Sequence, residues 1–129
     1  MKFTVLVHTA PASAGGSVTA LKFCRAVLAA GHELERVFFF RDAVHNASNN
    51  SVVPQDETDL MDQWQALIGE HNLDASVCVT SALRRGILNA EEAARWEKPA
   101  VTLQDNINIA GLGSLVDACL NADRTVSFG

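Results

Sequence analysis

Short apolar runs alternate with amphipathic stretches along the chain. Residues 3–7 are apolar except for Thr4, and residues 34–40 contain the continuous apolar run 37–40. Both segments are typical of strands covered on both faces of a parallel sheet. Between them, residues 17–30 have the periodicity of a helix, and Gly31 provides its C-terminal stop. The first third of the chain therefore predicts a strand, a helix and a second strand.

The middle of the chain continues this alternation. Apolar side chains recur at helical spacing at positions 60, 64, 67 and 68, just after three acidic residues that suit a helix N-terminus. Residues 76–79 predict a short central strand. Asn89 and Glu92 then form a capping pair that starts a short helix through Trp96, which Pro99 ends.

Three further segments complete the prediction. Residues 101–103 are expected to form a strand, and residues 125–128 a final one. An apolar helical stripe lies between them, at Leu112, Leu115, Val116, Cys119 and Leu120. Residues 41–53 are polar and rich in Asn and Ser, which predicts an exposed loop.

Alternating strands and helices predict a single flavodoxin-like, doubly wound α/β domain over residues 1–129, with about five mostly parallel strands flanked by helices. Chemistry in such folds gathers at the carboxyl ends of the strands. We therefore expect three loops to converge there, namely those at Pro11, at Arg41 and after Cys78, with Cys78 in a shallow cleft bordered by the other two.

Composition restricts the classes of function. Hydrophobic residues make up 48% of the chain and charged residues 19%, which favours a folded core over disorder. A formal charge of −5 gives no electrostatic reason for direct binding to nucleic acid. The apolar run at residues 3–7 is too short for a signal peptide or a membrane span, so we expect a cytoplasmic protein that is not in a membrane.

Three cysteines are present, without a C-x-x-C motif and without Cys and His spacings suited to zinc. An unpaired set of this kind is consistent with a reducing compartment. Cys24 lies in a strongly apolar helical segment and Cys119 lies in the apolar stripe, so both are expected to be packing residues.

Cys78 differs because it ends a predicted strand. Thr80 and Ser81 follow it and are expected to cap a short helix that contains Arg84 and Arg85, while Arg41 follows the neighbouring strand. A helix N-terminus and a nearby guanidinium both favour a thiolate, so we predict a nucleophilic Cys78 with a lowered pKa. The alternatives are that Cys78 is a small buried strand residue and that Arg84 and Arg85 are merely solvated. Arg41 has a similar alternative, as the solvated end of its strand.

Other motifs compete with this interpretation. Cys78 and Arg84 have the C-x5-R spacing of cysteine phosphatases, although the intervening residues contain no Gly to turn successive amides inward. Residues 15–17 do not complete a phosphate-binding loop motif. Of the four histidines, only His8 is expected near the predicted site, and a structural role is expected for it.

A set of collinear segments spans the chain: residues 1–3, 31–34, 37–42, 44, 46–47, 78, 82–86, 111–113 and 123–124. Together they resemble the TusD/DsrE family of sulfurtransferases, and within it the TusD-like members. The resemblance implies that Cys78 matches the sulfur-accepting cysteine of that family. It implies a persulfide relay from a TusA-like donor to a TusE-like acceptor, in a heterohexamer with TusB-like and TusC-like subunits, for 2-thiolation of a tRNA wobble uridine.

No metal or organic cofactor is implied by the resemblance. Two alternatives remain beside the phosphatase. One is a DsrE-like subunit of dissimilatory sulfur oxidation, which would use the same cysteine with DsrF-like and DsrH-like partners. The other is a non-catalytic scaffold subunit, because some members of such assemblies lack a working cysteine.

Overall fold

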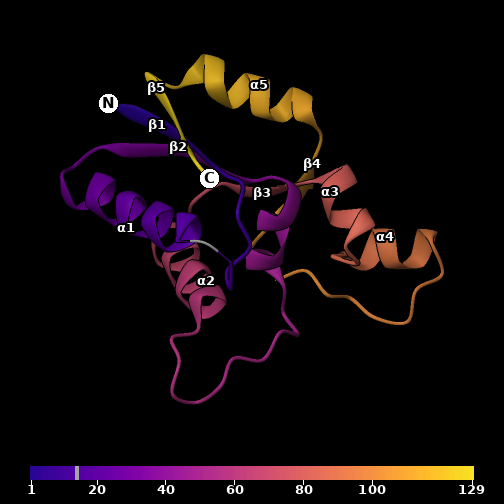
Figure 1. Ribbon diagram of the computed structural model, residues 1–129. Coiled ribbons are helices and arrows are strands. Elements are labelled where there is room, and N and C mark those ends of the chain that lie inside the picture. Colours follow the sequence, from indigo (N-terminus) through magenta and orange to yellow (C-terminus); the bar gives the residue numbers. More distant parts are fainter. Residues whose placement is uncertain (14) are drawn as a thin grey trace.

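A five-stranded parallel sheet forms the centre of the computed structural model, which describes residues 1–13 and 15–129 (Figure 1). The strand order is β4-β3-β2-β1-β5. The strands are β1 (Lys2–Val7), β2 (Glu33–Phe39), β3 (Ala75–Cys78), β4 (Asn108–Ala110) and β5 (Arg124–Phe128). The predicted α/β class, with five parallel strands, is confirmed.

Helices cover both faces of this sheet. Figure 1 shows α1 (Gly16–Ala29) and α2 (Leu60–His71) on one side and α5 (Leu112–Asn121) on the other. Strands β1 to β4 are added in one direction across the sheet, and the chain then returns to place β5 on the far side of β1. Because crossovers are right-handed, the reversal of direction puts the last helix on the opposite face from the earlier ones. The remaining helices are the 3-10 helix η1 (Arg41–Ala47), α3 (Val79–Arg84) and α4 (Ala90–Arg95).

The main core lies between the sheet and the helices α1 and α2. Its centre is Trp64, which is fully buried and packs edge-to-face on Phe39 with ring centroids 5.1 Å apart. The Trp64 indole Nε1–H donates to Ser17 Oγ at 3.0 Å, and the Ser17 hydroxyl donates to Asn46 Oδ1 at 2.7 Å. A buried polar chain therefore links α2, α1 and η1 inside an apolar core.

Two predictions about loops and strands are wrong. Residues 41–47 form η1, in which Ala43, Val44, Asn46 and Ala47 are buried, instead of starting an exposed loop. The Asn46 amide donates to the carbonyl oxygens of Thr9 and Ala43, so a polar side chain that indicated a loop satisfies buried backbone instead. Residues 101–103 contribute only an isolated bridge between Leu103 and Ser48, and the fourth strand is β4.

The apolar stripe of α5 also differs from expectation. Only Ala118 is buried in this helix, whereas Leu112, Val116 and Leu120 are exposed and Cys119 is only partly buried. The sheet presents polar donors here, because the Thr4 hydroxyl donates to the Ala118 carbonyl at 2.8 Å. Leu115 and Cys119 are partly buried, so Cys119 is not the core residue that the stripe predicts.

Cys24 is a packing residue as predicted, and its burial has a measurable consequence. Burial raises the pKa of the Cys24 thiol from its ordinary value of 9.0 to about 12. Between these values the unfolded chain releases the Cys24 proton while the folded chain keeps it, so stability falls as the pH rises. Above the ordinary thiol pKa, we expect the free energy of unfolding of the wild type to fall with pH more steeply than that of Cys24→Ala. The difference between the two slopes should be about 1.4 kcal/mol per pH unit.

Chemical denaturation at a series of pH values from 8 to 11 would measure this slope. Val27→Ala is the matched control, because Val27 is buried on the same helix and its truncation should lower stability equally at every pH. Equal slopes in wild type and Cys24→Ala would contradict the prediction.

No helix among the described residues has both the length and the apolar character needed to cross a membrane.

Candidate functional site

Cys78 lies where β3 ends and α3 begins. The strand pairs with β4, where Cys78 is in register with Ala110, and Cys78 is also the N-cap residue of α3. Its backbone is still extended, with φ −62° and ψ 127°, and the helix starts at the next residue. Thr80 and Ser81 therefore lie inside α3, and the prediction that they cap it is wrong.

The thiol is more enclosed than the sequence predicted. Cys78 is only 3% exposed. Ala75 and Val77 of β3 point into the main core, so Cys78, which alternates with them, lies on the opposite face of the sheet. Pro11 lines a cavity of about 360 Å³ together with His45 and residues 51–54, and neither Cys78 nor Arg41 is among the residues that line it.

Hydrogen bonds fasten α3 to the end of β2. The backbone N–H of Arg41 donates to Ser81 Oγ at 2.9 Å. Arg85, the C-cap residue of α3, adds a second link, because its Nε donates to Asp42 Oδ1 of η1 at 2.9 Å. Its guanidinium also donates to the Ser81 carbonyl at 3.2 Å, a bond within α3. Two predicted site residues, Arg41 and Ser81, are thus joined. Arg85, which the sequence placed in the predicted helix but not among the site residues, belongs to the same junction.

Arg41 has an unusual backbone conformation at this junction. Its φ is +53°, a left-handed value that costs a non-glycine residue roughly 1 kcal/mol or more. The bond to Ser81 holds this conformation, and the Arg41 guanidinium lies 5.4 Å from the ring centroid of Phe40. The His8 ring packs edge-on against the same Phe40 ring at 5.8 Å, which places the ends of β1 and β2 together.

Removing the Ser81 hydroxyl should loosen this junction. In Ser81→Ala the Arg41 N–H loses its acceptor, and we expect a loss of about 1 kcal/mol in the free energy of unfolding. Urea denaturation of the full chain measures it. Ser51→Ala is the control, because Ser51 lies in an exposed segment and its substitution should change stability little. A Ser81→Ala variant as stable as this control would contradict the prediction.

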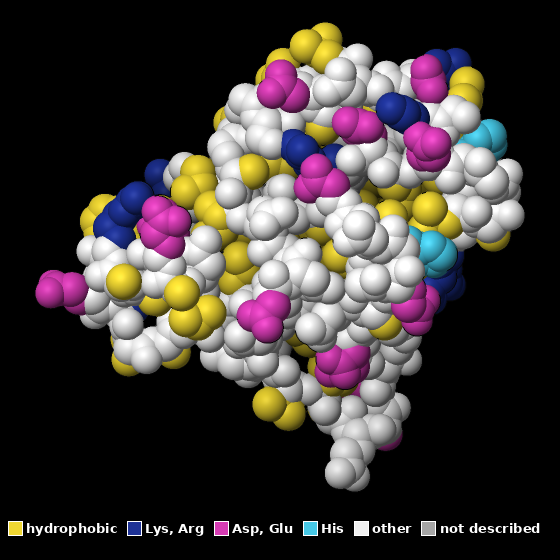
Figure 2. Space-filling model, turned by 180° about the vertical axis from the view of Figure 1, so that it is seen from behind, with side chains coloured by type: hydrophobic (Ala, Val, Ile, Leu, Met, Phe, Trp, Pro, Cys, Tyr) yellow, Lys and Arg dark blue, Asp and Glu magenta, His cyan; other side chains and the backbone are white. Residues whose placement is uncertain are grey.

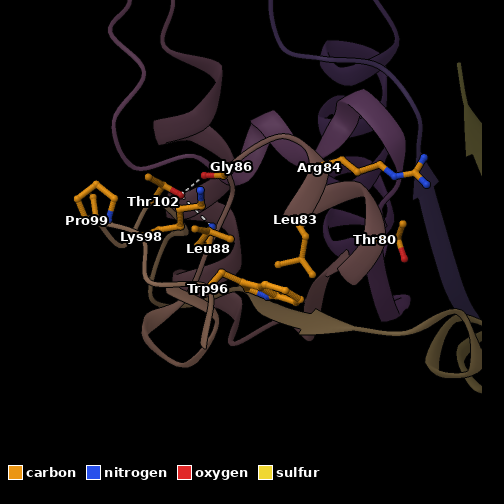
Figure 3. A pocket seen from close by; sticks show the side chains of 10 residues that line it. Thr80, Leu83, Arg84, Gly86, Leu88, Trp96, Lys98, Pro99 and Thr102 are labelled. Carbon is orange, nitrogen blue, oxygen red and sulfur yellow. Dashed lines mark hydrogen bonds between the residues drawn. The ribbon is translucent and has the colours of Figure 1, made fainter. Parts of the chain in front are cut away.

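Thr80 and Arg84 line a cavity beside α3. The cavity has a volume of about 720 Å³, Leu83 also lines it, and its opposite wall includes Trp96 and Lys98 (Figure 3). Arg84 is exposed and does not belong to the hydrogen-bonded junction at Ser81. The sequence did not predict Trp96 or Lys98 near the site, because no periodicity connects them with α3.

The segment between Cys78 and Arg84 does not form a phosphate-binding loop. Residues 79–84 are helical from the first residue after the cysteine. Their amides therefore point along the helix axis instead of converging on one anion. This geometry removes the structural basis for the phosphatase alternative. Among the described residues, no three His, Cys, Asp or Glu side chains are grouped as ligands of a metal ion would be.

Comparison with known proteins decides the family. The chain matches the DsrE/DsrF-like family over residues 1–128. It belongs to this family. Among solved structures, the ychN protein from E. coli superimposes with a TM-score of 0.81 over 99% of both chains, at 21% sequence identity, which supports the fold.

Relatives of this DsrE/DsrF-like chain are named sulfurtransferases. The chain is 47% identical to a sulfurtransferase TusD homolog of Pseudomonas aeruginosa, covering 100% of this chain and 98% of that one. It is 42% identical to sulfurtransferase TusD of Salmonella typhi, covering 99% and 100%. It is 40% identical to the putative sulfurtransferase DsrE of Allochromatium vinosum, covering 100% and 99%. These names support the sulfurtransferase activity expected from the sequence.

Proposed function

We propose that this DsrE/DsrF-like chain is a sulfur-relay subunit that carries sulfur as a persulfide on Cys78. The observation that carries the proposal is the position of Cys78 at the carboxyl end of β3, in a chain that aligns over its full length with proteins named sulfurtransferases. An enclosed thiol also suits this role, because low exposure protects a bound sulfane sulfur from stray thiols.

The proposed chemistry consists of two balanced thiol exchanges. The Cys78 thiolate attacks the terminal sulfur of a donor persulfide, the donor S–S bond breaks, and the donor cysteine leaves as a thiolate. Cys78 then carries the sulfur as –S–SH. An acceptor thiolate attacks that terminal sulfur, the new S–S bond forms on the acceptor, and Cys78 is released as a thiolate. No outside oxidant or reductant is consumed.

The wider assignment follows the TusD-like relatives. We propose a TusA-like donor, a TusE-like acceptor and TusB-like and TusC-like partner subunits, with sulfur destined for 2-thiouridine in tRNA in the cytoplasm. The 47% identity to the TusD homolog, against 40% to DsrE, favours this pathway over dissimilatory sulfur oxidation. We propose supporting roles for Arg41, Thr80, Ser81 and Arg84.

Mass spectrometry tests the proposal. The full chain, purified with its partner subunits, is incubated with a persulfidated TusA-like protein and then with a TusE-like protein. We expect one added sulfur on the peptide that contains Cys78, followed by its transfer to the TusE-like protein. A chain that supports tRNA thiolation without taking up sulfur would favour the scaffold alternative.

A further inference from the structure

The cavity between α3 and the segment after α4 is an open apolar groove. Its lining residues are Thr80, Leu83, Arg84, Gly86, Leu88, Trp96, Lys98, Pro99, Ala100 and Thr102. Figure 2 shows hydrophobic side chains on this α3–α4 side of the molecule, at the left of the view. The Thr102 hydroxyl accepts from the Leu88 N–H at 2.8 Å and donates to the Gly86 carbonyl, so the wall of the groove is tied to the loop that follows α4.

Trp96 is exposed but held in place. Trp96 faces Leu83 across the groove, as Figure 3 shows. Trp96 is 55% exposed. The indole Nε1–H donates to Glu92 Oε2 at 2.9 Å, and the buried Glu92 is itself paired with Arg95 at 3.2 Å. An ordered, exposed Trp is a strong anchor for a partner, because little conformational entropy is lost when it is covered.

The charges around the groove indicate the chemistry of its occupant. Arg84 and Lys98 are the charged residues that line it, and in Figure 3 they lie at opposite ends, with Leu83 and Trp96 between them. Within the described part of the chain neither forms an ion pair, although the chain as a whole carries a formal charge of −5. The groove therefore complements an apolar side chain flanked by acidic residues.

The groove is also adjacent in structure to the proposed sulfur carrier. Thr80, Leu83 and Arg84 occupy one face of α3, at helical spacing, and Cys78 is the N-cap of the same helix. Hydrogen bonds from the Arg41 N–H to Ser81 Oγ and from Arg85 Nε to Asp42 Oδ1 fix this helix to β2 and η1. A partner segment bound along the groove would thus be aligned by the rigid element that bears Cys78.

We infer that this groove docks the protein that accepts sulfur from Cys78, through an extended segment with an apolar side chain between acidic residues. The inference rests on the proposed function. Trp96 and Leu83 hold the apolar side chain, and Arg84 and Lys98 pair with the acidic residues. The groove thereby makes transfer selective for a protein acceptor over small thiols, which cannot use these contacts.

Single-turnover transfer separates docking from chemistry. The chain, with its partner subunits, is loaded with sulfur, and the rate of sulfur release is measured against concentration for the TusE-like protein and, separately, for dithiothreitol. We expect Trp96→Ala and Lys98→Glu each to raise the half-saturating concentration of the TusE-like protein about tenfold. Release to dithiothreitol should be unchanged. Val52→Ala, which truncates an apolar side chain that is 92% exposed elsewhere, is the matched control.

Each outcome decides between interpretations. If both groove variants keep the wild-type half-saturating concentration of the TusE-like protein, the inference is overturned. It is also overturned if the rates of sulfur release to the protein and to dithiothreitol fall equally, because the effect would then lie on Cys78 itself. Variants that lose their partner subunits would assign the groove to a subunit interface instead. Failure of the wild-type chain to load sulfur removes the proposed function, a result that is visible before any groove variant is tested. Lys98→Glu, at an exposed position, keeps the test valid if Trp96→Ala does not fold.

Discussion

Cys78→Ser should abolish sulfur uptake while leaving the fold intact. Serine is nearly the same size as cysteine, so the end of β3 and the N-cap of α3 can keep their geometry. A hydroxyl, however, does not ionise near neutral pH and cannot replace a thiolate as the sulfur nucleophile. We expect sulfur uptake by the peptide that spans position 78, and transfer to an acceptor, to fall to background. Mass spectrometry of the intact chain and of its peptides measures both.

Controls make this result specific to one thiol. Cys119→Ser is the matched variant, because Cys119 is a partly buried cysteine on α5 and lies outside the proposed site. It should load sulfur like the wild type, and circular dichroism should show that both variants are folded. Persulfide that persists at wild-type level in Cys78→Ser would place the carrier on another cysteine and end the proposed mechanism.

Trp64→Ala should cause the largest loss of stability among the substitutions considered. The substitution removes a fully buried indole from the centre of the main core and from its edge-to-face contact with Phe39. It also deprives Ser17 Oγ of the N–H that it accepts at 3.0 Å. Large-to-small core substitutions of this kind cost about 3–5 kcal/mol, against a total stability of roughly 5–15 kcal/mol for a natural domain.

The chain contains a natural control for this experiment. Trp96 is the second tryptophan and is 55% exposed, so Trp96→Ala should cost about 1 kcal/mol or less, mainly through the lost bond to Glu92. Urea denaturation followed by circular dichroism avoids dependence on tryptophan fluorescence. If the two variants were equally stable, the buried position of Trp64 in the core would be wrong.

The order of strands and helices follows from local sequence. The segments at residues 3–7 and 34–40 correspond to β1 and β2. The helix cap at Asn89 is predicted from the pair Asn89 and Glu92, and the Asn89 side chain accepts from the Glu92 N–H at 2.8 Å. Such signals are local, because strand burial and helix capping depend on neighbouring side chains. The location of Cys78 at a strand end was likewise predictable.

Long-range packing explains what the sequence could not predict. The sequence of η1 predicts a polar loop, but the Asn46 side-chain amide is buried and donates hydrogen bonds to the carbonyl groups of Thr9 and Ala43. The three-residue strand β4 is too short to carry a periodic signal and is defined by its pairing with β3. The stripe on α5 predicted burial, but the helix packs on the sheet at Ala118, whose carbonyl accepts from the Thr4 hydroxyl, and Leu112, Val116 and Leu120 are exposed.

By itself, the sequence determined the α/β class and the alternation of elements, because these depend on composition and periodicity. It also ranked Cys78 first among three cysteines as the proposed sulfur carrier, from its position at a strand end. Only the tertiary structure decided the surroundings of that thiol. It enclosed Cys78, joined Arg41 to Ser81, and placed Trp96 and Lys98 opposite Arg84 across a groove. Contacts of this kind bring together residues far apart in sequence, so no local pattern records them.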